Sequence, residues 1–250
     1  EARIDIAVVR FPYISNFTDL AALEATADVR VRYLRSADAL GSPDLIVLPG
    51  SKNTLHDLHW LRESGLGAAI QEHAARNVPV MGICGGYQML GTSLVDETGS
   101  EGGGSMQGLG LLPVSTEFAA SKRRTRTAAQ VLDCSGPLGA LSGAALEGYE
   151  IHMGRTEREE GARALVRLED GTLDGCQQGN IYGCYLHGFF DSASCRKALL
   201  TALCASKGIE LQTHDFDLAA YRDEQYDILA TGLRKHLNMD LIYQIIDGAS

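Results

Sequence analysis

The strongest constraint on the fold is an alternation of short β-branched segments with helical segments over the first ninety residues. The pattern predicts strands at residues 4–9, 29–33, 44–48 and 78–83, and helices at 18–27, 66–76 and from about 86 onward. Because the links are short, the crossovers should be right-handed and build a mainly parallel sheet with helices on both faces. In such α/β sheets ligands bind beyond the carboxyl ends of the strands, so the loops after residues 9, 48 and 83 should meet.

The second half of the chain is punctuated by Gly and Pro and should be more antiparallel. It predicts strands at 109–114, 127–132, 145–152, 164–168 and 180–186, and helices at 192–206 and 218–237. The segment 96–107 is rich in Gly and Ser, a composition that favours a mobile surface loop.

Charge and hydropathy exclude two kinds of partner. With 22 Lys and Arg against 32 Asp and Glu, the net charge of −10 argues against nucleic acid, and we interpret the one basic segment, 122–126, as a solvated loop or strand edge. No stretch approaches 18 apolar residues and no signal peptide is present, which excludes a membrane span. The six cysteines lack metal-site spacing, so we expect no metal and a reduced, cytoplasmic protein.

The sharpest functional signal is Gly-Ile-Cys-Gly-Gly at residues 82–86, where a buried strand meets a helix. Glycines two positions before and after Cys84 relieve crowding in a strained turn, as in a nucleophile elbow. A helix start favours the thiolate form of Cys84, and the amide of Gly85 is placed to bind an oxyanion. This segment therefore predicts a cysteine nucleophile.

A second glycine-containing loop, Leu-Pro-Gly-Ser-Lys-Asn-Thr at residues 48–54, follows another predicted strand. Gly50 can bring a main-chain N–H close to a reacting carbonyl, which would supply the second oxyanion donor. The loop is not a phosphate-binding Walker A sequence, because Ser51 separates the glycine from the lysine. We therefore do not expect this chain to bind ATP by itself.

Two glycine-flanked histidines are candidates for proton transfer. His187 follows a predicted strand, and the fold rather than the sequence brings Cys–His partners together, so His187 is the candidate base. His152 has a similar setting and could line the same pocket. His56 and His59 have helical spacing but no nearby carboxylate or cysteine ligands, which argues against a metal site.

The segments 82–88 and 185–187 resemble class I, triad-type glutamine amidotransferase domains. More narrowly, segments 14–19, 48–54, 148–154 and 185–188 resemble the C-terminal glutaminase half of the cobyric acid synthase family. The resemblance covers nearly the whole chain. It implies a flavodoxin-like α/β fold, with a single amidotransferase domain over residues 1–250 and a C-terminal helical extension at 215–250. The chain begins without Met, and the resemblance implies an upstream ATP-binding synthetase domain.

The resemblance also implies roles for single residues. Cys84 would attack the side-chain amide of L-glutamine and form a γ-glutamyl thioester, and His187 would protonate the departing ammonia and then activate water. The amides of Gly50 and Gly85 would hold the oxyanion, and Gln88 would help to hold the substrate.

The reaction that the resemblance implies is the ATP-dependent amidation of the b, d, e and g carboxylates of adenosylcobyrinic acid a,c-diamide in cobalamin biosynthesis. The corrinoid, ATP and Mg would bind the synthetase domain, so no cofactor is expected on this chain. No residue here points to the corrinoid independently of the resemblance.

One position departs from the wider superfamily, in which a carboxylate commonly lies two residues after the histidine. Here that position is Phe189, which leaves the group that orients His187 open. Glu150, Asp19 or a main-chain carbonyl could serve, and we hypothesise Glu150.

Three other functions stay open at this point. A glutaminase subunit of a lipid II amidating complex would share the elbow, although the segment 148–154 argues against it. A non-catalytic docking module for a synthetase domain would not need Cys84 and His187. A thiol hydrolase of the α/β-hydrolase fold would need an acidic triad member between these two residues, and none can be assigned.

Overall fold

The chain divides into two compact units, residues 1–214 and 215–250, and the computed structural model describes residues 3–210 and 217–248. The first unit contains a six-stranded sheet in the order β13-β14-β6-β4-β1-β3. These strands are β1 (Ile4–Val9), β3 (Val29–Leu34), β4 (Leu45–Leu48), β6 (Val80–Ile83), β13 (Cys176–Gln178) and β14 (Ile181–Cys184). Every neighbouring pair is parallel except β13 with β14, so the predicted mainly parallel sheet is confirmed.

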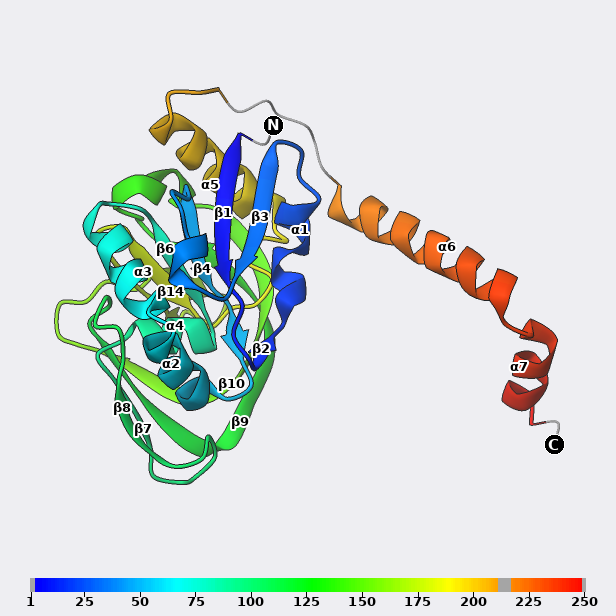
Figure 1. Ribbon diagram of the computed structural model, residues 1–250, viewed down its shortest axis with the longest axis horizontal. Helices are drawn as coiled ribbons and strands as arrows, with labels where there is room; N and C mark the ends of the chain where they lie inside the picture. Colours follow the sequence, from blue (N-terminus) through cyan, green and yellow to red (C-terminus); the bar gives the residue numbers. More distant parts are fainter. Residues whose placement is uncertain (1–2, 211–216, 249–250) are drawn as a thin grey trace. The chain divides into compact units, whose positions relative to one another are not determined.

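Helices cover both faces of this sheet, which explains why β4, β6 and β14 are buried along their whole length. The helices are α1 (Ala21–Glu24), α2 (Thr54–Glu63), α3 (Leu66–Ala75), α4 (Gly85–Leu90) and α5 (Ala193–Ser206). Figure 1 shows α2 and α3 together on one side of the sheet and α1 on the other.

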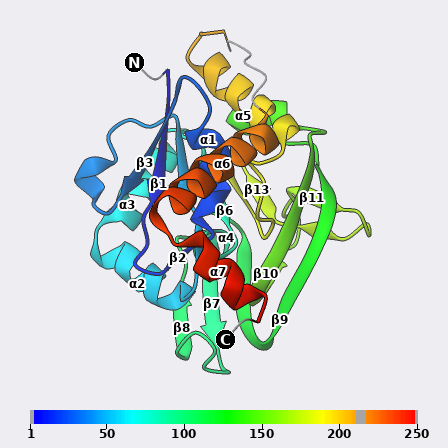
Figure 2. The ribbon, with the colours of Figure 1, turned by 90° about the vertical axis from the view of Figure 1, so that its right-hand side faces the viewer.

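A second sheet follows the order β12-β11-β9-β7-β8, with β10 also paired to β9. Its strands are β7 (Ser93–Asp96), β8 (Gly104–Gln107), β9 (Val114–Val131), β10 (Ala145–Arg158), β11 (Val166–Leu168) and β12 (Leu173–Asp174). Figure 2 shows β9 and β10 side by side as a long antiparallel pair. The predicted antiparallel character is confirmed for most of these pairs, although β7 and β9 are parallel.

Two strand predictions in this region were wrong. Residues 109–113 form no strand, because the amides of Leu109 and Leu111 donate to Met89 and Leu90 at the end of α4. Residues 127–132 are not a separate strand, because β9 continues from Val114 to Val131. The basic segment 122–126 therefore lies within a strand, where Arg124 and Arg126 are exposed; the side chains of 122 and 123 lie outside the described part.

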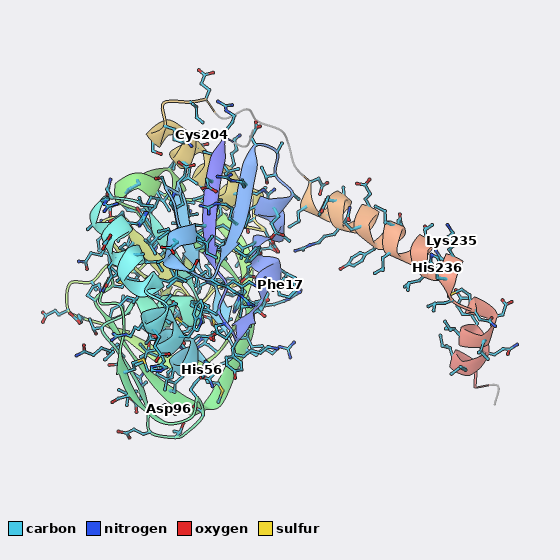
Figure 3. All side chains as sticks on the ribbon, in the orientation of Figure 1. Phe17, His56, Asp96, Cys204, Lys235 and His236 are labelled. Carbon is cyan, nitrogen blue, oxygen red and sulfur yellow. The ribbon has the colours of Figure 1, made fainter. Side chains whose placement is uncertain are left out.

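Two local predictions need correction for physical reasons. The helix expected at 18–27 is a 3-10 turn, Phe17–Leu20, followed by the short α1, and the Thr26 hydroxyl donates to the Ala22 carbonyl as the helix ends. The segment 96–107 is more ordered than its composition predicts, because the Asp96 carboxylate accepts from the amides of Ser100, Glu101 and Gly103. Figure 3 labels Asp96 at the end of β7.

The second unit consists of α6 (Leu218–His236) and α7 (Met239–Ile246), and the helix predicted at 218–237 is confirmed. Asp217 and Asn238 cap these helices, with side-chain oxygens that accept from amides in the first turn of each. None of the described helices combines the length and the apolar character that crossing a membrane requires.

Candidate active site

The turn between β6 and α4 holds Cys84 in a backbone conformation that is rare for a residue with a side chain, with φ 51° and ψ −110°. The positions two before and two after Cys84 have no room for a side chain. A Cβ on Gly86 would lie 1.9 Å from the Leu48 carbonyl oxygen, and one on Gly82 would lie 2.6 Å from the Tyr87 nitrogen. This packing allows the strand to turn sharply into the helix and presents the thiol at the carboxyl edge of the sheet.

The pairing of β14 with β6 brings His187 to the same edge. The two strands are parallel neighbours, and the Cys84 amide donates to the Cys184 carbonyl at 2.9 Å. His187 follows β14, exchanges two main-chain hydrogen bonds with Tyr149 of β10, and stacks its ring on the Tyr149 ring with centroids 5.0 Å apart. The imidazole is fully buried, so its position is defined on several sides.

Electrostatics keep the His187 ring charged at neutral pH. Burial by itself lowers the pKa of a histidine, but hydrogen bonds with Asp19 and with Cys84 outweigh burial and raise the pKa of His187 to about 9. The Cys84 sulfur also lies 3.7 Å from the Ile151 carbonyl oxygen. The charged His187 ring is therefore a proton donor beside the Cys84 sulfur.

Asp19, and not the hypothesised Glu150, orients His187. Asp19 Oδ2 lies 2.7 Å from His187 Nδ1, and Oδ1 accepts from the Gly188 amide at 3.2 Å. Glu150 follows Tyr149 in β10, and successive residues of a strand point to opposite faces. Because the Tyr149 ring stacks on His187, the Glu150 side chain leaves the strand on the other face.

Asn16 is a further member of the site that the sequence interpretation did not single out. Its Nδ2 lies 3.1 Å from Nδ1 and 2.9 Å from Nε2 of His187, nearly the same distance from both nitrogens, so the amide lies over the face of the ring. Asn16 adopts φ 51° and ψ 38°, a left-handed conformation that asparagine tolerates better than most residues. The available signal was the segment 14–19, which carries part of the family resemblance and lies after the first predicted strand.

Gly50 lies between the elbow and the histidine. It belongs to β5 (Gly50–Ser51), which pairs with β2 (Ile14–Ser15), and a Cβ on Gly50 would lie 3.2 Å from His187 Cε1. A Cβ on Gly85 would lie 2.9 Å from the Ser51 nitrogen, so β5 passes close to the elbow. The predicted meeting of the loops after β1, β4 and β6 is therefore confirmed.

Gln88 and His152 pack around Tyr185. Gln88 is buried, its Oε1 accepts from the Thr54 hydroxyl at 3.2 Å, and its Nε2 donates to the Tyr185 hydroxyl at 3.0 Å. These contacts fix the orientation of the Gln88 amide, and its contact with the substrate stays a prediction. His152 stacks on Tyr185 with ring centroids 3.6 Å apart, and its Nδ1 lies 2.7 Å from the Gly154 oxygen.

The two histidines with helical spacing, His56 and His59, have structural partners. His56 packs edge-on against Tyr13, and His59 lies 3.1 Å from Glu63 one turn further along α2. Within residues 3–210 and 217–248, no group of three or more His, Cys, Asp or Glu side chains could hold a metal ion. All six cysteines are free thiols.

A mainly parallel α/β sheet with a cysteine at a strand-to-helix elbow and a histidine just after the neighbouring strand is the architecture of glutamine amidotransferase domains. Residues 5–195 match the CobB/CobQ-like glutamine amidotransferase domain, and the chain belongs to this family.

Its relatives include proteins about twice as long as the part that this chain matches. Cobyric acid synthase of Ruminiclostridium cellulolyticum is 47% identical over 252 residues, which cover 98% of this chain and 49% of that protein. Cobyric acid synthase of Citrobacter koseri is 47% identical over 249 residues, which cover 97% of this chain and 49% of that protein. The chain thus spans about half the length of the curated relatives that it matches.

Solved structures agree on the fold. The structure of PurLQS from Thermotoga maritima has a chain with a TM-score of 0.60 and 19% identity, covering 80% of this chain and 99% of its own. A crystal structure of a glutamine amidotransferase has a TM-score of 0.58 and 17% identity, covering 80% of this chain and 98% of its own.

Proposed function

We propose that Cys84 and His187 of this glutamine amidotransferase domain hydrolyse L-glutamine, and that the ammonia passes to an ATP-binding synthetase half. The observation that carries the proposal is the strained turn at Cys84 beside a histidine whose pKa is raised to about 9. A reactive thiolate needs such a partner, whereas a buried structural cysteine does not.

In the first step the Cys84 thiolate attacks the side-chain amide carbon of glutamine and forms a carbon–sulfur bond. The His187 imidazolium donates its Nε2 proton to the amide nitrogen, the carbon–nitrogen bond breaks, and ammonia leaves. In the second step water attacks the thioester, neutral His187 accepts a proton from the water, and the carbon–sulfur bond breaks. Glutamate leaves, and the thiolate and imidazolium are restored.

The oxyanion that forms in each step needs two donors. The Gly85 amide, directly after the nucleophile, is the first. The second comes from β5, where the Lys52 amide donates to the Tyr13 carbonyl of the preceding loop at 2.9 Å. Amides alternate in an antiparallel ladder, so the Gly50 amide turns toward β2 and the Ser51 amide turns away from it. This alternation favours Ser51 over Gly50, the donor expected from the sequence.

Asp19 acts as a positioning residue in this scheme. A carboxylate on Nδ1 holds that nitrogen in its protonated form and directs Nε2 toward Cys84. The same charge stabilises the imidazolium that each catalytic cycle needs.

For the acceptor, we propose the b, d, e and g carboxylates of adenosylcobyrinic acid a,c-diamide, as part of cobalamin biosynthesis. The support is the 47% identity to proteins named cobyric acid synthase, and the length of those relatives leaves room for a synthetase half that binds ATP, Mg and the corrinoid. The proposed location is the cytoplasm, in line with six free thiols in one chain.

The test of glutamine hydrolysis is intact-mass spectrometry after exposure to a diazo-ketone analogue of glutamine. We expect one adduct on the parent chain and on Cys134→Ser, the matched control at another buried cysteine, and none on Cys84→Ser. If no adduct forms on the parent, alone or together with the synthetase half, the proposal is wrong.

The acceptor is tested separately with glutamine that carries ¹⁵N in its side-chain amide. When this chain is mixed with the synthetase half, ATP, the a,c-diamide and the labelled glutamine, ¹⁵N should enter four amides of the corrinoid. If the diazo-ketone analogue labels Cys84 but no ¹⁵N reaches the corrinoid, the proposed glutaminase activity stands and the proposed acceptor is wrong.

A further inference from the structure

The second unit exposes an unusual amount of apolar surface. Among the described residues, nine of the twelve large apolar side chains that are exposed lie on α6, on α7 or between them. Ile245 is 65% exposed and Ile246 is 71% exposed. Large apolar side chains exposed in this number mark a site of interaction with another protein surface.

The sequence of α7 is typical of a helix that is buried against another surface. Six of its eight residues are apolar, and the two polar ones, Asp240 and Gln244, are four positions apart and share one face. Leu241 and Ile245, also four positions apart, belong to the apolar remainder. A helix that is apolar around most of its circumference is a buried helix.

The longer α6 presents a second apolar stripe. Tyr226, Leu229 and Leu233 recur at the three- and four-residue spacing of one helix face, and all three are exposed. The last turn of α6 carries Lys235 and His236, labelled in Figure 3, so the stripe ends at a basic helix end.

The extent of the relatives indicates what covers these faces. The amidotransferase domain match ends at residue 195, and the Thermotoga maritima chain aligns over 99% of its own length with only 80% of this chain. In contrast, the relative from Ruminiclostridium cellulolyticum matches 98% of this chain, so its match extends into residues 215–250. Helices equivalent to the second unit therefore occur in relatives that also have the additional half. The amidotransferase domain match does not include these helices.

We propose that the apolar faces of α6 and α7 dock into an apolar groove on the ATP-binding synthetase half of the same protein. This inference rests on the proposed function, because it assumes that half as partner. Docking through α6 and α7 would hold the ammonia-producing and ammonia-consuming halves together in addition to the chain that connects them.

Hydrogen exchange tests the occupant of this surface. The amides of residues 239–246 are followed in the 250-residue chain, at two concentrations, and in the protein that contains both halves. We expect them to exchange at least about tenfold more slowly only when both halves are present. Three outcomes overturn the proposal. The first is fast exchange in both proteins, and the second is slow exchange in the 250-residue chain at both concentrations. The third is slow exchange in the 250-residue chain at the higher concentration only, which would indicate a second copy.

Paired variants of α7 separate docking from catalysis. In the two-half protein, Leu241→Asp with Ile245→Asp should lower glutamine-dependent amidation by about tenfold or more, while amidation with free ammonia and labelling of Cys84 stay unchanged. The matched control, Asp240→Asn with Gln244→Glu on the polar face, should change none of these. Equal losses in both pairs, or no loss in either, would contradict docking through the apolar face. A parent protein whose Cys84 is not labelled would instead contradict the proposed function.

Discussion

Oδ2 of Asp19 lies 2.7 Å from Nδ1 of His187, although 168 positions separate the two residues in the chain. The other carboxylate oxygen accepts from the amide of Gly188, the residue next to the histidine. Asp19 therefore holds both the ring and the backbone on which the ring is mounted. The arrangement supplies the orienting carboxylate that the superfamily commonly carries two residues after the histidine, where this chain has Phe189.

Replacing Asp19 with Asn should separate the charge of this contact from its shape. Asn can still accept a hydrogen bond from Nδ1, but without the negative charge the pKa of His187 should fall below its value of about 9. Glutamine hydrolysis should fall by about 10²- to 10⁴-fold, the range typical of a lost general acid–base function. NMR titration of the imidazole measures the first effect and an ammonia-release assay the second.

The control for this prediction is Glu150→Gln. Glu150 is a buried carboxylate on the same strand as Tyr149, so it tests for a general effect of removing a buried charge. The pKa of His187 should stay near 9 in Glu150→Gln. If Glu150→Gln lowers that pKa and Asp19→Asn does not, the assignment of Asp19 is wrong.

The elbow should be more stable with glycine at position 84. The φ of 51° with ψ of −110° strains any residue that has a Cβ, and such strain is worth about 1–3 kcal/mol. The larger entropy of glycine in the unfolded chain offsets about 0.4–1 kcal/mol of that. We therefore expect the free energy of unfolding of Cys84→Gly, measured in urea, to exceed that of Cys84→Ala by roughly 1–2 kcal/mol. Equal stability of the two variants would show that the turn relaxes.

Gly86 should be the least tolerant glycine near the site. An added methyl group would lie 1.9 Å from the Leu48 carbonyl oxygen, which is backbone of the adjacent strand β4 and cannot move aside alone. Gly86→Ala should therefore lower the free energy of unfolding by about 3 kcal/mol or more, as measured in urea. The matched substitution is Gly139→Ala, where the nearest atom would lie 3.5 Å away and stability should be almost unchanged.

Glu101 should make stability depend on pH near neutrality. Its carboxylate accepts from the Thr54 amide at the start of α2, yet burial, together with the charges of Asp96 and Asp57, raises the pKa of Glu101 to about 7. Because the pKa of Glu101 is higher in the folded than in the unfolded protein, the folded state binds the proton more tightly. The folded state therefore loses stability as pH rises from about 4.5 to about 7.

The glutamine variant removes this titration and keeps an oxygen acceptor. The melting temperature of Glu101→Gln, relative to the parent, should therefore rise by a few degrees between about pH 5 and pH 8. Glu97→Gln, at an exposed glutamate of the same loop, should show no such trend. A relative melting temperature that falls over this range for Glu101→Gln would contradict the raised pKa.

Much of the architecture was predictable from local pattern. Apolar runs and glycine spacing identified the strands β1, β4, β6 and β14, and parallel strands must end at one edge of a sheet, so the meeting of Cys84, Gly50 and His187 followed from their order. The long β9 was not predictable, because neither the Gly and Pro punctuation nor the basic segment within it indicates one strand that pairs with β10 on both sides of an irregularity in the register.

The sequence by itself determined the elbow that presents Cys84, since the residue types and spacing at positions 82–86 restrict the local backbone to one kind of turn. Only the tertiary structure decided which carboxylate serves His187. Glu150 was excluded because a strand side chain one position from Tyr149 points to the opposite face, a matter of register between β10 and its neighbours. Asp19 was selected because the left-handed turn at Asn16 redirects the chain after β2 toward a histidine on a distant strand. Contacts between segments so far apart depend on packing, which local preferences do not encode.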